Sequence, residues 1–137
     1  MLEQPATLRR ARSARPAPAR LKRIVLQAAP ARHSPDDGEP DRYTLTAPLD
    51  SEGYIDPQAW ADQAADCRVV RETADGRRHE GLLWHGERAG WFFLYPGDQG
   101  LEAAYEFHLS VFVPGQKVSL RRLGREYVLT ILGIGLA

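Results

Sequence analysis

Short apolar runs separated by turn residues fill the sequence from Tyr43 to the C-terminus. Apolar and polar residues alternate in 42–47 and in 105–113, the period of a strand with one buried face. Between the runs lie pairs such as Asp75-Gly76 and Pro114-Gly115, which are typical of tight turns joining antiparallel strands. The pattern predicts about seven strands, at residues 42–47, 67–72, 77–85, 91–95, 101–113, 116–123 and 126–136. The start of the fifth, residues 101–104, also suits a helical turn, and its alternation is clear from Tyr105 onward.

One short helix interrupts this pattern. Asp56 has the side chain of a helix N-cap, and Pro57 suits the first helical position because its missing N–H needs no partner there. Trp60 and Ala64 are four residues apart and share one helical face. We therefore predict a helix over 57–65.

The order of these elements predicts the fold class. Strands do not alternate with helices of crossover length, so a parallel sheet is not expected. Antiparallel strands with tight turns can close or stack to bury an aromatic face, and both a small barrel and a sandwich achieve this. We predict an all-β domain over 41–137, a small antiparallel barrel or sandwich of about seven short strands with one short helix.

The first 40 residues have a different composition. They contain six of the ten prolines and no aromatic residue, so they lack the apolar surface needed to offset the entropy of ordering. We predict a disordered basic Pro/Ala/Arg-rich tail over 1–40. Residues 19–29 lack proline and carry Leu21, Ile24, Val25 and Leu26, which suggests a short amphipathic helix formed on a partner.

Charge divides the chain in the same way. Residues 1–40 carry eight basic and four acidic side chains, and residues 41–137 carry ten and fourteen. The formal net charge of zero is therefore the sum of a +4 tail and a −4 domain. This leaves the tail free to dock on its own domain by charge attraction.

Composition also excludes several kinds of site and of targeting segment. The single cysteine, Cys67, excludes an intramolecular disulfide and a four-cysteine zinc site, and its flanks Asp66 and Arg68 indicate a half-buried, unreactive thiol. No apolar stretch approaches the roughly 20 residues of a membrane span, and no secretory signal pattern is present. We therefore expect a cytoplasmic protein.

The sequence gives little support to catalysis. His79, His85 and His108 lack the paired spacing of metal ligands, and no serine elbow or phosphate-binding loop is present. No cofactor and no metal are implied. The least favoured hypothesis is a metal-dependent small-molecule enzyme that uses His85 and His108 with a carboxylate such as Glu106.

Aromatic residues are the richest functional signal. Trp91, Phe93 and Tyr95 share one face of the strand over 91–95, and a hairpin through 86–90 would allow Trp84 to lie beside Trp91 on the same face. Such a strand is either central and buried on both sides or lines a groove for a ligand. The sequence favours a non-catalytic binding or scaffolding module for an unknown protein or small-molecule partner. The expected contact residues are Trp84, His85, Trp91, Tyr95 and His108.

Nucleic-acid binding is the alternative, less favoured because the domain is acidic. Arginines crowd the tail and recur near the C-terminus, and such groups neutralise phosphates. The residues expected to make these contacts are Arg9, Arg10, Arg12, Arg121, Arg122 and Arg125.

Overall fold

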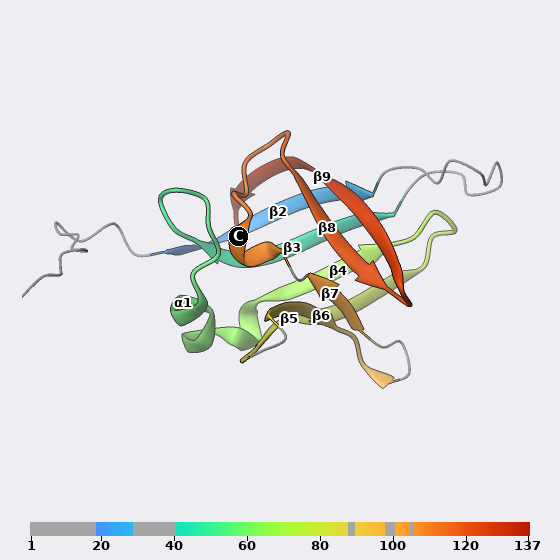
Figure 1. Ribbon diagram of the computed structural model, residues 1–137, viewed down its shortest axis with the longest axis horizontal. Coiled ribbons are helices and arrows are strands. Elements are labelled where there is room, and N and C mark those ends of the chain that lie inside the picture. Colours follow the sequence, from blue (N-terminus) through green and yellow to red (C-terminus); the bar gives the residue numbers. More distant parts are fainter. Residues whose placement is uncertain (1–18, 29–40, 88–89, 98–100, 105) are drawn as a thin grey trace, which may run out of the picture.

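A computed structural model describes residues 19–28, 41–87, 90–97, 101–104 and 106–137. Eight antiparallel strands close into a barrel in which every strand pairs with its sequence neighbours, and β2 closes the circle by pairing with β9 (Figure 1). The strands are β2 (Arg20–Ala28), β3 (Arg42–Leu49), β4 (Arg68–Glu72), β5 (Arg78–Gly86), β6 (Gly90–Leu94), β7 (Leu101–Ala104), β8 (Lys117–Arg122) and β9 (Arg125–Leu136). The predicted small antiparallel barrel is thus confirmed, and the sandwich alternative is excluded.

Hydrophobic alternation explains most of the barrel wall. Inward positions of successive strands are filled by fully buried aliphatic and aromatic side chains, while outward positions are polar or partly exposed. Burial of these side chains supplies the main stabilising term of the fold. The fully buried aliphatic members are Ile24, Leu26, Leu45, Val69, Leu83, Leu120, Leu129 and Ile131.

The first strand corrects the sequence-based interpretation of residues 19–29. Arg20–Ala28 form β2 and not a helix, with Ile24, Leu26 and Ala28 buried at alternate positions. The run suits either structure locally, but pairing with both β3 and β9 satisfies its backbone on two sides. The barrel therefore begins within the segment assigned to the tail. The rest of that segment, residues 1–18 and 29–40, lies outside the described residues.

A second correction concerns residues 105–113. The alternation there predicts a strand, but β7 ends at Ala104 and a 3₁₀ turn, η4 (Phe107–Leu109), follows. Phe107 and Phe112 are both buried although they are five residues apart, which a regular strand does not allow on one face. The chain bends here so that both rings reach the barrel interior, where they pack edge to face at 5.1 Å.

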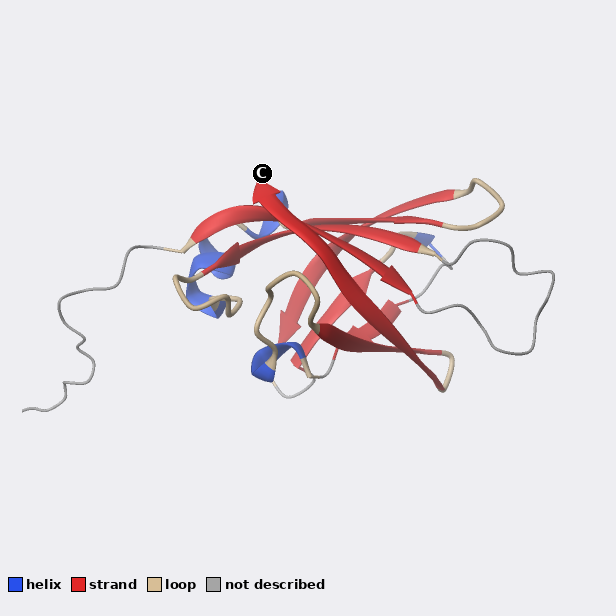
Figure 2. Cartoon of the chain, turned by 90° about the horizontal axis from the view of Figure 1, so that it is seen from above, coloured by secondary structure: helices blue, strands red, loops and turns tan. Residues whose placement is uncertain are grey.

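The predicted helix begins where its signals indicate. α1 (Pro57–Asp62) starts after Asp56, whose carboxylate accepts hydrogen bonds from the backbone N–H groups of Gln58 and Ala59. The helix ends at Asp62, and a 3₁₀ turn, η2 (Ala64–Asp66), leads into β4. Figure 1 shows α1 at one end of the barrel and the β4–β5 turn at the other. The long β8–β9 hairpin crosses the other strands in the view of Figure 2.

Candidate functional site

The barrel interior differs between its two ends. At the end near α1, Trp60 packs edge to face on Trp91 at 5.6 Å and donates its indole N–H to the Leu83 carbonyl oxygen at 2.8 Å. Phe107 packs against Phe93 further inside. This end is filled by aromatic rings, whereas the opposite end holds charged side chains.

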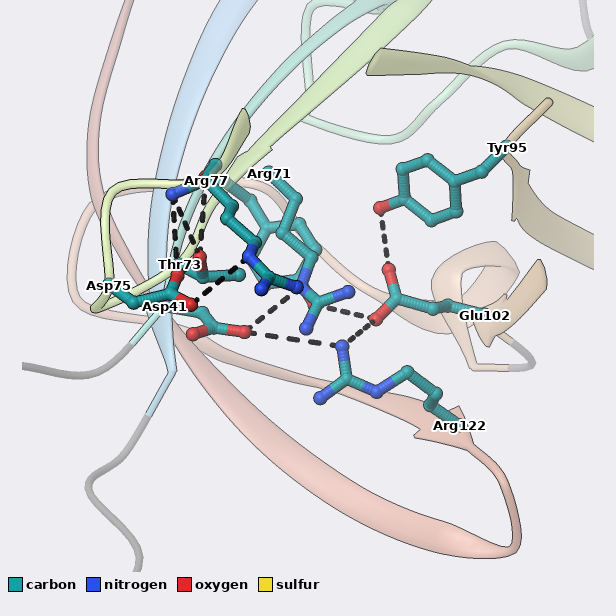
Figure 3. A network of polar contacts seen from close by, with 9 residues as sticks. Asp41, Arg71, Thr73, Asp75, Arg77, Tyr95, Glu102 and Arg122 are labelled. Atoms are coloured by element: carbon teal, nitrogen blue, oxygen red, sulfur yellow. Dashed lines mark hydrogen bonds and ion pairs between the residues drawn. The ribbon is translucent and has the colours of Figure 1, made fainter. Parts of the chain in front are cut away.

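The charged end is centred on Glu102, the one buried residue with a charged side chain among those described, which is 1% exposed. Its Oε2 accepts hydrogen bonds from the Tyr43 hydroxyl at 2.7 Å and from Arg122 Nη1 at 2.9 Å. Its Oε1 accepts the Tyr95 hydroxyl at 2.6 Å, as Figure 3 shows. A buried carboxylate is tolerated only when paired in this way, because transfer of an isolated charge from water is very unfavourable.

A second ion pair lies beside Glu102. Arg71 Nε donates to Asp41 Oδ2 at 2.9 Å, and Arg122 Nη1 lies 4.0 Å from the same oxygen (Figure 3). Two carboxylates and two guanidinium groups thus balance in charge near the barrel mouth. We call Asp41, Tyr43, Arg71, Tyr95, Glu102 and Arg122 the mouth network.

The mouth network spans the weakest seam of the barrel wall. Among the described residues, β7 pairs with β8 through one register pair, Ala103 and Arg121. Glu102 and Arg122 lie one residue beyond that pair, on the inner face, and join the two strands by their side chains. The network therefore holds the barrel closed where the backbone ladder is shortest.

The tyrosines of the network are held in the neutral form. Burial, followed by the charge of Glu102 and the hydrogen bond to it, raises the pKa of Tyr43 well above its ordinary value. The same causes raise the pKa of Tyr95. Both hydroxyls stay protonated and donate to Glu102, so neither tyrosine can act as a base near neutral pH.

The outer surface carries a different feature on β5, β6 and β7. Register places Leu82, Leu94 and Leu101 in one cross-strand row, and Trp84, Phe92 and Ala103 in the next. All six project from the wall on the side opposite to the buried Leu83 and Phe93. We call these six residues the apolar face.

Three members of the apolar face are substantially open to solvent. Trp84 is 39% exposed, Leu94 41% and Leu101 52%. The Trp84 ring packs edge to face against the Trp60 ring, with the two centroids 5.3 Å apart. A supported aromatic ring among adjacent leucines is typical of a contact surface.

The structure brings together three of the five residues expected to bind a ligand or partner, because Trp84, His85 and Trp91 pack against Trp60 at 5.3, 6.0 and 5.6 Å. The hairpin register pairs Trp91 with His85 and Trp84 with Phe92, so the expectation that Trp84 and Trp91 share a face is wrong. A shift of one residue in register moves a side chain to the other side of the sheet. Strand 91–95 is accordingly buried on its inner side, while Leu94 on its outer side is partly exposed.

Tyr95 and His108 lie apart from this group of rings. The His85 ring is half-buried and lies 4.4 Å from the Trp91 ring near α1, whereas Tyr95 belongs to the mouth network. His108 is exposed on η4. Only Trp84 belongs to the apolar face, and its other members follow from pairing that the sequence did not specify.

The arginines expected to contact nucleic acid are also divided. Arg121 projects outward from β8, Arg122 projects inward to Glu102, and Arg125 is exposed across the β8–β9 turn. Arg9, Arg10 and Arg12 lie outside the described residues. Nucleic-acid binding through the tail stays a prediction.

No group of three or more histidine, cysteine or acidic side chains that could hold a metal ion occurs within the described parts of the chain. Cys67 is fully buried between η2 and β4, more deeply than the half-buried position expected from sequence. Burial, with a smaller contribution from Asp66, raises the pKa of its thiol to about 11. A thiol in this state is unreactive at neutral pH.

Sequence reasoning missed Glu102, the centre of the mouth network. The one indication in the sequence was that Glu102 lies among the apolar residues 101–104. That segment suits both a helical turn and a strand, so the direction of the side chain could not be predicted. Pairing of Glu102 with Phe93 shows that it faces inward, and this pairing is known only from the sheet register.

No family model, no curated protein and no solved structure matches the chain. Within the described residues, no helix has the length and apolar character needed to cross a membrane. The mouth network and the apolar face are the two features of the described residues that bear on function.

Proposed function

We propose that this protein is a non-catalytic binding module that recognises a protein partner through the apolar face of β5, β6 and β7. The observation that carries the proposal is the in-register exposure of Trp84, Leu94 and Leu101 on three adjacent strands. Together these side chains present an exposed apolar area on the order of 300 Å², the size of the largest apolar patch on a typical soluble monomer, which is often functional.

The contacts within the mouth network indicate that its role is structural. Its charges are paired, and its tyrosines donate to a carboxylate that already has an arginine partner. A general base or nucleophile needs a group left free to act on a substrate. The network instead stabilises the wall on which the apolar face is displayed.

Binding of the neutral apolar dye Nile red tests the proposal. At about 1 µM protein, the regime in which weak self-association is negligible, we expect dye emission to rise with the wild-type protein. Leu94→Glu places a charge at the centre of the apolar face and should remove most of this emission.

Leu132→Glu is the matched control, because Leu132 is 45% exposed but lies on β9, outside the apolar face. It should keep the wild-type emission, with folding of both variants verified by circular dichroism. Equal emission from wild type and Leu94→Glu would contradict the proposal.

A further inference from the structure

We infer that residues 1–18 of the same chain, which we call the N-terminal segment, cover the apolar face, so that a partner must displace them to bind. This inference rests on the binding role proposed above and names how that surface is regulated. The occupant follows from where the segment enters the barrel, from the charge beside the apolar face and from the order of residues in the segment.

The N-terminal segment enters the barrel at the end that carries α1. Arg20, the first residue of β2, pairs with Leu49, and Leu49 forms a bridge to Ile55 shortly before α1 begins. Figure 1 shows the start of β2 and α1 at the same end of the barrel. The Trp60 ring of α1 in turn contacts the Trp84 ring of the apolar face at 5.3 Å. The helix therefore lies between the entry point of the segment and the apolar face.

The path along α1 is short for a segment of this length. The helix has six residues and is about 9 Å long, and with the tryptophan contact at its far side the apolar face begins on the order of 20 Å from the entry point. An extended chain covers that distance with about six residues, whereas the N-terminal segment has 18. Because the segment is tethered, its effective concentration at the apolar face is on the order of 1 mM, so weak contacts are sufficient to hold it.

The surface along this path is acidic. Residues 50–66 contain five acidic and no basic side chains. Glu52, Asp62 and Asp66 among them are exposed, and none of the three forms an ion pair within the part of the chain that the structure describes. We call these three residues the acidic strip. Its carboxylates are free to accept cations from a covering segment.

The acidic strip reaches the edge of the apolar face. The backbone N–H of Leu83 donates to the Cys67 carbonyl oxygen at 2.8 Å. Asp66 precedes Cys67 and Trp84 follows Leu83 in antiparallel segments, so Asp66 and Trp84 lie on the same side of this hydrogen bond, toward α1. Arg68 lies farther from α1, beside the row of leucines. A segment that crosses the strip therefore meets Trp84 first.

The N-terminal segment carries complementary features in the same order. It holds four arginines and one glutamate. Counted back from the entry point, the arginines come first, and the apolar Leu8 and Leu2 lie beyond them. From the same point, the surface presents the acidic strip first and the apolar face beyond it. A segment laid along this path sets arginines on carboxylates and leucines on the apolar face, so both parts of the surface are covered at once. The arginines are Arg15, Arg12, Arg10 and Arg9.

Reversal of charge in the N-terminal segment of the full chain tests the inference. Arg10→Glu with Arg12→Glu should release the apolar face and raise Nile red emission about two- to five-fold over wild type at low salt. Salt at about 0.5 M screens exposed ion pairs, so it should raise wild-type emission toward that of the variant and leave the variant unchanged.

Arg42→Glu with Arg125→Glu is the control, because it changes the net charge by the same amount. Both arginines are exposed, and they lie near the mouth network, at the end of the barrel opposite to α1. This control should emit like wild type, with folding of all variants verified by circular dichroism.

An exchange of charge between the two surfaces sharpens the test. Asp62→Lys with Asp66→Lys should raise emission as the arginine reversal does. The combination of all four substitutions again sets opposite charges against each other, so emission should return close to the wild-type value. A direct effect of the lysines on the dye would persist in the combined variant and would contradict the inference.

Other results overturn the inference in distinguishable ways. Equal emission from wild type and from Arg10→Glu with Arg12→Glu, together with loss of emission in Leu94→Glu, would refute the N-terminal segment as the occupant and leave the binding role intact. Absence of emission from both wild type and the arginine variant would refute both. A difference between these two proteins that appears at about 50 µM but not at about 1 µM would mean that the segment of another molecule covers the face, and would also overturn the inference.

Discussion

Replacement of Glu102 by glutamine tests whether the mouth network holds the barrel together. The substitution keeps the size of the side chain but removes its charge and one of its two acceptor oxygens. Arg122 then keeps only Asp41 as a carboxylate neighbour, at 4.0 Å, and one tyrosine hydroxyl loses its acceptor.

The magnitude follows from the three hydrogen bonds that Glu102 accepts. Two of them fall from the range of charged bonds to that of neutral ones and the third is lost, at about 1 kcal/mol apiece. Removal of one partner from a buried ion pair gives a similar result of about 3–5 kcal/mol. Because the Arg122 side chain is only 20% exposed, solvent screening reduces this little. We expect Glu102→Gln to lower the free energy of unfolding by about 3 kcal/mol.

Urea unfolding at pH 7, followed by tryptophan fluorescence, measures this loss. With a slope of roughly 2 kcal/mol per molar urea, the midpoint should fall by about 1.5 M. Glu106→Gln, a change at an exposed glutamate, is the control and should alter stability by less than about 0.5 kcal/mol.

A double substitution separates the ion pair from general packing. Glu102→Gln combined with Arg122→Met removes both charges, so the double variant should be more stable than the sum of the single losses indicates. Additive losses, or a midpoint shift below about 0.3 M for Glu102→Gln, would refute the reasoning.

Three further predictions follow from buried groups. Because the pKa values of Tyr43 and Tyr95 are raised in the folded state, the native barrel holds these protons more tightly than the unfolded chain. These groups should therefore leave stability unaffected below pH 10 and lower it above pH 10. Absorbance at 295 nm should show that their tyrosinates form together with unfolding. Ionisation of both residues in the folded state would contradict this. Cys67, with its buried thiol and a pKa of about 11, should react with a thiol reagent at pH 8 only when denaturant is added, and rapid labelling of the native protein would disprove its burial. Gly81→Ala should destabilise the fold by about 1–3 kcal/mol, because the new Cβ would lie 2.4 Å from the Leu94 carbonyl oxygen, whereas Gly133→Ala meets no atom within 4 Å and is the control in the same thermal melt.

Local signals in the sequence were sufficient for the turns and the helix start. Asp56 and Pro57 begin α1 because capping depends on neighbours within one helical turn. Gly76 and Gly115 adopt positive φ in the tight turns predicted for them, a conformation that glycine reaches without strain. Gly81 lies inside a strand at a close approach to the Leu94 backbone, a place where glycine is commonly found.

Only the tertiary structure decided which residues meet. Arg20–Ala28 lacks a strong local preference, and it becomes β2 because two distant strands offer backbone partners. This strand is also the one that closes the barrel, which is why the sequence left barrel and sandwich open.

The alternation of apolar residues by itself determined that this chain forms antiparallel strands with a buried face, because that period is a local property of the backbone. The sheet register, set by pairing between distant segments, decided that Trp91 lies inside and Trp84 outside. It also brought Glu102 to Tyr43, Tyr95 and Arg122, which are up to 59 residues apart from it in sequence. Both the mouth network and the apolar face depend on that register, so no reading of single segments could reveal them.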